Sequence, residues 1–375
     1  MILKLTALIG KINIRHQAVA SLAGVVFAAV LLLAGFQVKV LASHQWNPMA
    51  FVLERPADIP AEQTWGVGYD GRFSYALATQ AWGSTENLDQ PGYRYQRILY
   101  PLLVRLISLG QEQAVPWVML GLNLAAAGLG CAALGRLLQR RGASPWLGLV
   151  FLFSLGYLLA MRMDLLEPLA LALALWGWAV YEEERPFPAV LLLALSGLAK
   201  EVGLVFAAGL ALWELAQKRP LRAAGLFAGS VAPYLVWYLA LHIWFGTSAT
   251  QVSQSRLLFP FTGLSYLQDP LSRGLVGVWV LAPAVLAGLA AAWELLRRWG
   301  RGMRPDAALL LAQAGLVAVM PAPTWEDPLA ILRIGLGLVA VLLVWLSGGH
   351  RRLLPLACAL WAPSGLVLLF VPSML

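Results

Sequence analysis

Apolar runs of about 20 residues recur along the whole chain, and short clusters of basic residues separate many of them. A run of this length is what a helix needs to cross a lipid bilayer. Hydrophobic residues make up 60% of the chain and charged residues only 12%, whereas soluble domains carry roughly 25% charge. The sequence therefore predicts one all-α integral membrane domain over residues 1–375, with about eleven transmembrane helices.

Basic residues decide the expected orientation of these helices, because cytoplasmic loops are enriched in lysine and arginine. The net charge of +8 is distributed among such clusters, so it does not indicate a nucleic-acid partner. Basic residues also precede the first apolar run, which is longer than the core of a signal peptide. We therefore expect an uncleaved first transmembrane helix over 18–41, with the N-terminus in the cytoplasm.

A long polar interval, 43–115, follows on the predicted outer side of the membrane. Connections of this length usually carry function or secondary structure of their own. Residues 97–109 within it are amphipathic and too short to span, which favours a helix lying along the membrane surface.

A second unusual segment, 187–215, is apolar but is interrupted by Lys200 and Glu201. Its basic flanks both look cytoplasmic, so an even number of crossings should join them. We expect two short helices that meet at Lys200 and Glu201 near the outer side, beside a hollow in which charge is tolerated.

Ionisable residues that interrupt or border apolar runs are the first candidates for a site. Such groups are costly in a membrane and tend to face a cavity and form pairs. The set is Asp164, Glu167, Lys200, Glu201 and Arg333. A purely structural ion-pair network is the alternative interpretation.

The polar interval also contains Tyr69-Asp-Gly-Arg-Phe-Ser-Tyr75, followed by Leu88-Asp-Gln-Pro-Gly-Tyr-Arg-Tyr-Gln-Arg-Ile-Leu-Tyr-Pro101. The Asp-Gly pair alone is a turn signal. Together, the two stretches resemble the first outer loop of bacterial membrane glycosyltransferases of the GT-C superfamily, of the mannosyltransferase-like, cell-surface-glycopolymer type. The same resemblance is weaker at two later stretches, Leu198-Ala-Lys-Glu201 and Leu332-Arg333.

The resemblance implies a GT-C-like fold in the bacterial inner membrane, with an active site facing outward. It implies transfer of a hexose, mannose-like sugar or pentose from a polyprenyl-phosphate carrier to a hydroxyl on a glycan, lipid or protein acceptor. Asp70 matches the position of the family's essential acid. Because Gly71 takes the place of a frequent second acid, use of a divalent cation (Mg²⁺ or Mn²⁺) stays open.

The residue types agree with this chemistry. A positioned carboxylate such as Asp70 can serve as general base for an acceptor hydroxyl, and one displacement would invert the anomeric centre. Fixed cations would stabilise the departing phosphate, and the candidates are Arg94, Arg97, Arg333 and Lys200. Asp164, Glu167 and Glu201 are candidates for binding acceptor hydroxyls or orienting those cations, and Tyr69 for contacting substrate.

Two other functions also fit a polytopic protein with charged residues near its apolar runs. A lipid or solute transporter or flippase of the cell envelope needs buried charge as well, but near the middle of the bilayer. A non-catalytic partner of an envelope assembly would leave Asp70 as a turn residue.

Overall fold

The computed structural model describes residues 2–52, 69–246 and 259–370, with the backbone alone described for residues 2–18 and 369–370. Helices form throughout these residues, and no strand occurs among them. The predicted all-α class is confirmed to this extent. Part of the predicted outer segment 43–115 lies outside the described residues.

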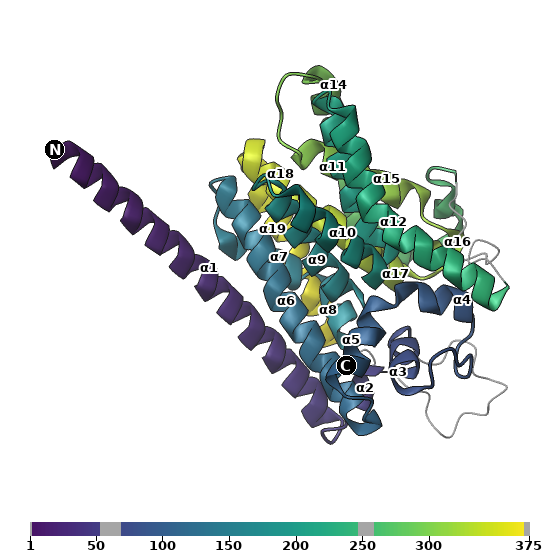
Figure 1. Ribbon diagram of the computed structural model, residues 1–375. Helices are drawn as coiled ribbons and strands as arrows, with labels where there is room; N and C mark the ends of the chain where they lie inside the picture. Colours follow the sequence, from purple (N-terminus) through teal and green to yellow (C-terminus); the bar gives the residue numbers. More distant parts are fainter. Residues whose placement is uncertain (1, 53–68, 247–258, 371–375) are drawn as a thin grey trace.

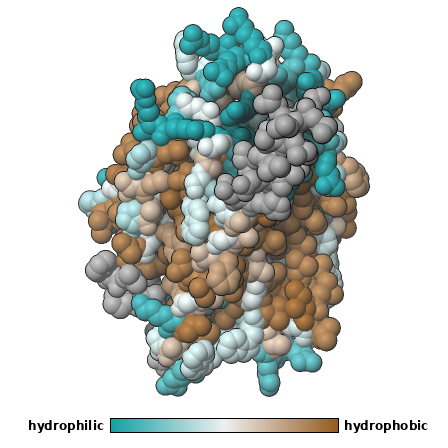
Figure 2. All heavy atoms as spheres, turned by 90° about the vertical axis from the view of Figure 1, so that its left-hand side faces the viewer, coloured by the Kyte–Doolittle hydropathy of each residue, from teal (hydrophilic) through white to brown (hydrophobic). Residues whose placement is uncertain are grey.

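Within the described residues, four helical segments are long and apolar enough to cross a membrane: Val19–Ser43, Glu112–Arg140, Pro220–Phe245 and Pro270–Arg297. The first belongs to α1 (Ile2–Ser43), which begins well before the predicted residue 18. The others contain α6 (Val115–Arg140), α12 (Pro220–Phe245), and α13 (Pro270–Val276) joined to α14 (Ala282–Arg297). On the face shown in Figure 2, apolar residues form a broad band between two hydrophilic ends.

Shorter apolar helices fill the body of the bundle (Figure 1). They are α9 (Glu167–Tyr181), α10 (Pro186–Ala199), α11 (Leu204–Ala216) and α15 (Asp306–Val319). At 1.5 Å per residue, helices of this length fall short of a bilayer core of about 30 Å. The prediction that α10 and α11 are two short helices meeting at Lys200 and Glu201 is confirmed.

Two other apolar segments are bent. The first, residues 145–162, is divided into α7 (Gly148–Leu152) and α8 (Leu155–Arg162), and the two parts differ in direction by 62°. Ser154 has an extended backbone at the break. Similarly, α17 (Pro328–Ile334) and α18 (Leu336–Gly349) differ by 40°. With each bent pair counted as one span, the described residues contain up to six candidate spans, so the predicted eleven are not confirmed.

Small helices cover one end of this bundle. In the first outer segment they are α2 (Met49–Val52), α3 (Gly71–Thr79), α4 (Pro91–Arg94) and α5 (Leu99–Ile107). The helix predicted over 97–109 is therefore confirmed as α5, with slightly narrower bounds. Later in the chain come α16 (Ala322–Glu326), α19 (Leu354–Trp361) and α20 (Val367–Phe370). Of these, α19 packs against α7 and α18, and the residue Arg351 before it bonds to Arg141, so α19 begins at the other end of the bundle.

Charged residues predicted on the cytoplasmic side gather at the opposite end of α6 and α9. Arg141 follows α6 and pairs with Glu182, which follows α9, and with Asp306 at the start of α15. Arg140 pairs with Glu183 at 2.6 Å. Charged residues at the ends of three helices, α6, α9 and α15, therefore lie together in space.

One predicted helix-surface pair is wrong. The four-residue spacing of Glu214 and Lys218 predicts an ion pair along one helix. They do not form it, because α11 ends at Ala216 and Lys218 has a φ of 61°. Glu214 instead accepts a hydrogen bond from the Tyr181 hydroxyl at 2.6 Å and lies 3.9 Å from Arg219. The same four-residue spacing predicts a pair between Glu294 and Arg298, and this pair is confirmed at 3.4 Å.

Candidate functional site

Asp70 lies at the N-terminus of α3, where the helix dipole favours a negative charge. Its side chain makes no capping hydrogen bond to α3 among the described residues, so the carboxylate is not used to end the turn. Instead one carboxylate oxygen accepts a hydrogen bond from Arg94 Nη1 at 2.9 Å, and the side chain remains 29% exposed. This arrangement leaves part of the carboxylate open to a ligand.

Arg94 is the last residue of α4 and holds two carboxylates at once. Its Nε and Nη2 atoms each donate to Asp89 at 2.8 Å, while Nη1 reaches Asp70. The guanidinium also lies 3.7 Å from the centre of the Phe73 ring. Arg94 is therefore fixed by the ring and by Asp89, and it fixes Asp70 in turn.

Cations control the charge state of Asp70. Burial raises the pKa of this carboxyl, but Arg94, followed by Arg333, Arg97 and Lys200, lowers it by more. The net pKa lies well below the usual range, so Asp70 is ionised at neutral pH.

Arg97 and Glu201 form a second pair beside Asp70. Arg97 ends a short 3-10 turn after α4, and Glu201 begins the turn between α10 and α11. Arg97 donates to both oxygens of Glu201, at 2.9 and 2.6 Å, in the two-pronged geometry that suits a guanidinium and a carboxylate. It also donates to the Tyr93 hydroxyl at 2.6 Å.

Glu167, the first residue of α9, holds the other two predicted cations. Lys200 Nζ and Arg333 Nη1 both donate to Glu167 Oε1, at 2.6 and 2.7 Å. All three side chains are at most 4% exposed. Glu167 Oε2 is buried and has no hydrogen-bond partner among the described residues.

Tyr69 connects Arg333 to a further acid, Asp327. Arg333 donates to the Tyr69 hydroxyl, which donates to one oxygen of Asp327. The other oxygen of Asp327 caps α17 by accepting from the Leu329 amide at 2.9 Å. Burial raises the pKa of Tyr69 far above its ordinary value, so its hydroxyl stays a neutral donor.

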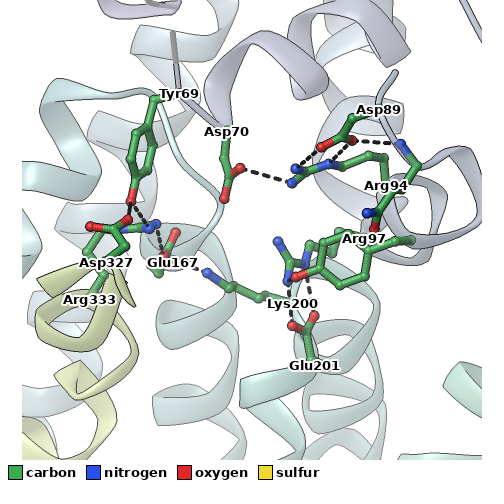
Figure 3. Close-up of polar contacts among 12 residues, drawn as sticks. Tyr69, Asp70, Asp89, Arg94, Arg97, Glu167, Lys200, Glu201, Asp327 and Arg333 are labelled. Carbon is green, nitrogen blue, oxygen red and sulfur yellow. Dashed lines mark hydrogen bonds and ion pairs between the residues drawn. The ribbon is translucent and has the colours of Figure 1, made fainter. Parts of the chain in front are cut away.

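Helix packing explains how residues so distant in sequence meet. Gly156 in α8 lies against the backbone of Leu332 in α17, where a Cβ atom would collide with the Leu332 carbonyl oxygen. This close approach brings Arg333 to the start of α9. Figure 3 shows Asp70 between two groups, with Tyr69, Asp327 and Arg333 on one side and Arg94 and Asp89 on the other.

The structure thus brings together eight of the nine predicted site residues: Tyr69, Asp70, Arg94, Arg97, Glu167, Lys200, Glu201 and Arg333. The ninth, Asp164, is fully buried and accepts a hydrogen bond from Asn123 of α6 at 2.7 Å. No hydrogen bond or ion pair joins it to the other eight among the described residues, so it lies behind the site rather than in it.

Sequence reasoning missed three partners of this cluster, Asp89, Tyr93 and Asp327, and it also missed Asn123, the partner of Asp164. Asn123 had a usable signal, because it is a polar residue within an apolar run. Asp327 also had one, since an Asp before Pro328 is typical of a helix start. Asp89 and Tyr93 belong to the polar interval 43–115 of the sequence, where such residues are usually solvated.

No group of three or more His, Cys, Asp or Glu side chains is close enough to hold a metal ion among the described residues. Asp70, Asp164 and Glu167 each have their polar contacts with Arg94, Asn123 or the Lys200–Arg333 pair instead. Comparison of the chain with protein-family models, curated proteins and solved structures finds no significant match.

Proposed function

We propose that this chain is a GT-C-like membrane glycosyltransferase that takes a sugar from a polyprenyl-phosphate carrier. In this proposal it lies in the bacterial inner membrane with about eleven spans, broken and short helices included, and with Asp70 facing outward. The observation that supports it most is an ionised, partly exposed carboxylate surrounded by four buried or nearly buried cations. A base beside fixed positive charge is what transfer from a sugar phosphate needs.

The cations around Asp70 are not equally available to a phosphate. Arg94 faces two carboxylates, and Arg97 is held by both oxygens of Glu201. Lys200 and Arg333, in contrast, share a single oxygen of one carboxylate, Glu167. The surplus positive charge therefore lies at Lys200 and Arg333, and we assign the phosphate of the donor to this pair.

The proposed reaction is a single displacement. The acceptor hydroxyl oxygen attacks the anomeric carbon while its proton passes to an oxygen of Asp70. The bond between that carbon and the phosphate oxygen breaks, and the electron pair leaves with the polyprenyl phosphate. Lys200 and Arg333 stabilise the added negative charge, and the anomeric configuration is inverted.

The low pKa of Asp70 fits this order of events. Without a ligand, the surrounding cations keep the carboxylate ionised but make it a weak base. A bound phosphate would bring negative charge to Lys200 and Arg333, which would raise the pKa of Asp70. Donor binding would thus strengthen the base just before it is needed.

The position of the charges favours transfer over transport. Glu167 and its partners lie at the first residue of α9, and the Arg141 network lies just beyond the last residue of α9, Tyr181. A transporter is expected to hold its substrate near the middle of its long helices. The described ion pairs instead gather at the two ends.

The proposal is tested with purified protein in nanodiscs and a panel of polyprenyl-phosphate sugars. Release of free polyprenyl phosphate is followed by mass spectrometry, with crude envelope glycolipids and glycans supplied as acceptors. Turnover of at least one donor is expected. Donors that cross the membrane of proteoliposomes without being cleaved would instead support the transporter.

Variants then test the charge assignment. Lys200→Gln should raise the KM for the donor about tenfold or more, because it removes one of the two surplus cations. Arg94→Gln should mainly lower kcat, since Arg94 orients Asp70. Glu86→Gln, at an exposed acid of the same outer segment, is the matched control and should leave both constants unchanged. Equal effects of Lys200→Gln and Arg94→Gln on KM would contradict the assignment.

A further inference from the structure

The turn between α8 and α9 has an unusual residue at its tightest point. The Met163 amide donates to the Leu159 carbonyl and the Leu165 amide to the Ala160 carbonyl, both at 3.0 Å. This pattern closes a helix end when the residue between them is left-handed, which is normally glycine or asparagine. Here that residue is Asp164, with a φ of 50°. A strained position of this kind is a reason to look for a function.

The Asp164 side chain is built into the core rather than into the site. It is 0% exposed, as is Asn123, whose Nδ2 atom donates to Asp164 Oδ1 at 2.7 Å. Since α6 carries Asn123, this hydrogen bond ties the α8–α9 turn to one of the longest helices. An exposed loop acid would have water as an alternative partner, but a buried one depends on its neighbour.

Asp70 is placed directly by this turn. Gly71, the next residue, faces the carbonyl groups of Met163 and Asp164, and a Cβ atom on Gly71 would collide with the Met163 oxygen. The same atom would lie 3.5 Å from the Asp164 oxygen. The start of α3 therefore rests on the turn, and only glycine allows the approach.

The other half of the site begins at the same turn. Glu167 follows Asp164 by three residues, opens α9, and holds Lys200 and Arg333. The segment 163–167 thus contacts Gly71, the residue next to Asp70, and also contains Glu167, which binds Lys200 and Arg333. A shift of this segment would move the two halves relative to each other.

We infer that Asp164 is a positioning residue, which holds the α8–α9 turn through Asn123 and so sets the place of Asp70 relative to the Lys200–Arg333 pair. This inference rests on the proposed function, because it assigns Asp164 a role in aligning base and phosphate. It replaces the expectation that Asp164 binds acceptor hydroxyls, since a fully buried carboxyl has no surface to offer them.

Two substitutions separate positioning from substrate contact. Asp164→Asn keeps an oxygen that can accept from Asn123, and asparagine tolerates the left-handed region. Asp164→Ala removes the acceptor, and its Cβ still opposes the left-handed backbone. We expect donor turnover by Asp164→Asn within about threefold of wild type, and at least a tenfold loss of kcat in Asp164→Ala with the donor KM little changed. Asn123→Ala removes the donor from the other side and should reproduce the loss in a chain that keeps Asp164.

Hydrogen–deuterium exchange provides a readout that does not depend on activity. Amide protection over Gly71–Thr79 should match wild type in Asp164→Asn and fall in Asp164→Ala and Asn123→Ala. If wild type turns over no donor, the proposed function fails while this exchange result still decides whether Asp164 positions α3.

Two outcomes would overturn the inference. One is a loss of turnover in Asp164→Asn as large as in Asp164→Ala with α3 protection intact, since Asp164 would then act through its charge on a substrate. The other is unchanged α3 protection in both Asp164→Ala and Asn123→Ala.

Discussion

Replacing Asp164 with asparagine should change how the stability of the protein depends on pH. Burial raises the pKa of the Asp164 carboxyl from about 3.8 to about 7, although the hydrogen bond from Asn123 opposes the rise. The folded state therefore binds this proton more tightly than the unfolded state. The resulting stability is fully present below pH 3.8 and is lost as the pH rises toward 7.

The size of the effect follows from the same shift. Each pH unit between the two pKa values changes the free energy of unfolding by about 1.4 kcal/mol for one proton. Between pH 5 and pH 7, wild type should therefore lose on the order of 2–3 kcal/mol that Asp164→Asn does not lose. In chains of 150–250 residues, a change of 1 kcal/mol in stability shifts the Tm by about 2–4 °C. We therefore expect the Tm difference between the two proteins to change by a few degrees in this longer chain.

Thermal unfolding in detergent, followed by intrinsic tryptophan fluorescence, measures this difference. Wild type and Asp164→Asn are compared at pH 5, 6, 7 and 8. Other groups titrate in the same way in both proteins, so their effect drops out of the difference in Tm. The Tm of the variant relative to wild type should rise with pH. Parallel Tm curves for the two proteins would refute the argument that a buried, proton-binding carboxyl holds the α8–α9 turn.

Three further outcomes follow from the contacts of the site. Glu201→Gln leaves the buried Arg97 guanidinium without its carboxylate and should cost about 1–3 kcal/mol, measured as a lower Tm; an unchanged Tm would show that the pair is not formed. Gly71→Ala should abolish turnover by displacing Asp70, whereas Gly121→Ala, whose added methyl meets no atom within 4 Å, should keep full activity; comparable activity in both would contradict the close approach. Because the pKa of Asp70 lies well below its usual range, the carboxylate stays ionised between pH 5 and pH 8. The value of kcat/KM, which reports the free enzyme, should therefore show no titration of Asp70 from pH 8 down to pH 5. A fall in kcat/KM centred near pH 6 that is absent from an Asp70→Glu variant would contradict this.

The sequence predicted the parts of this fold that depend on hydropathy. Long apolar runs became α1, α6, α12 and α14, and the interruption at Lys200 and Glu201 became the junction of two short helices. The number of spans was not predictable in the same way. A hydropathy run does not report where a helix bends, as at Ser154, or how far a short helix reaches across a membrane.

The sequence predicted most of the residues that form the site, but not which of them pair with each other. Charged residues near apolar runs are costly unless paired, and this reasoning identified Glu167, Lys200 and Arg333. It did not show that both cations share one oxygen of Glu167, because that depends on the contact of α8 with α17. Nor did it separate Asp164 from Asp70, because both are aspartates and the residue type does not show that Asp164 is buried behind a turn.

The central claim is that Asp70 is the base for sugar transfer from a polyprenyl phosphate. The most direct measurement compares release of polyprenyl phosphate from one donor by wild type and by Asp70→Asn in the same nanodiscs, after tryptophan fluorescence has shown that both are folded. We predict a loss of about 10²–10⁴-fold in kcat for the variant, which is the usual contribution of a general base. Equal rates for the two proteins would contradict the claim and would leave Asp70 as a residue of the α3 turn.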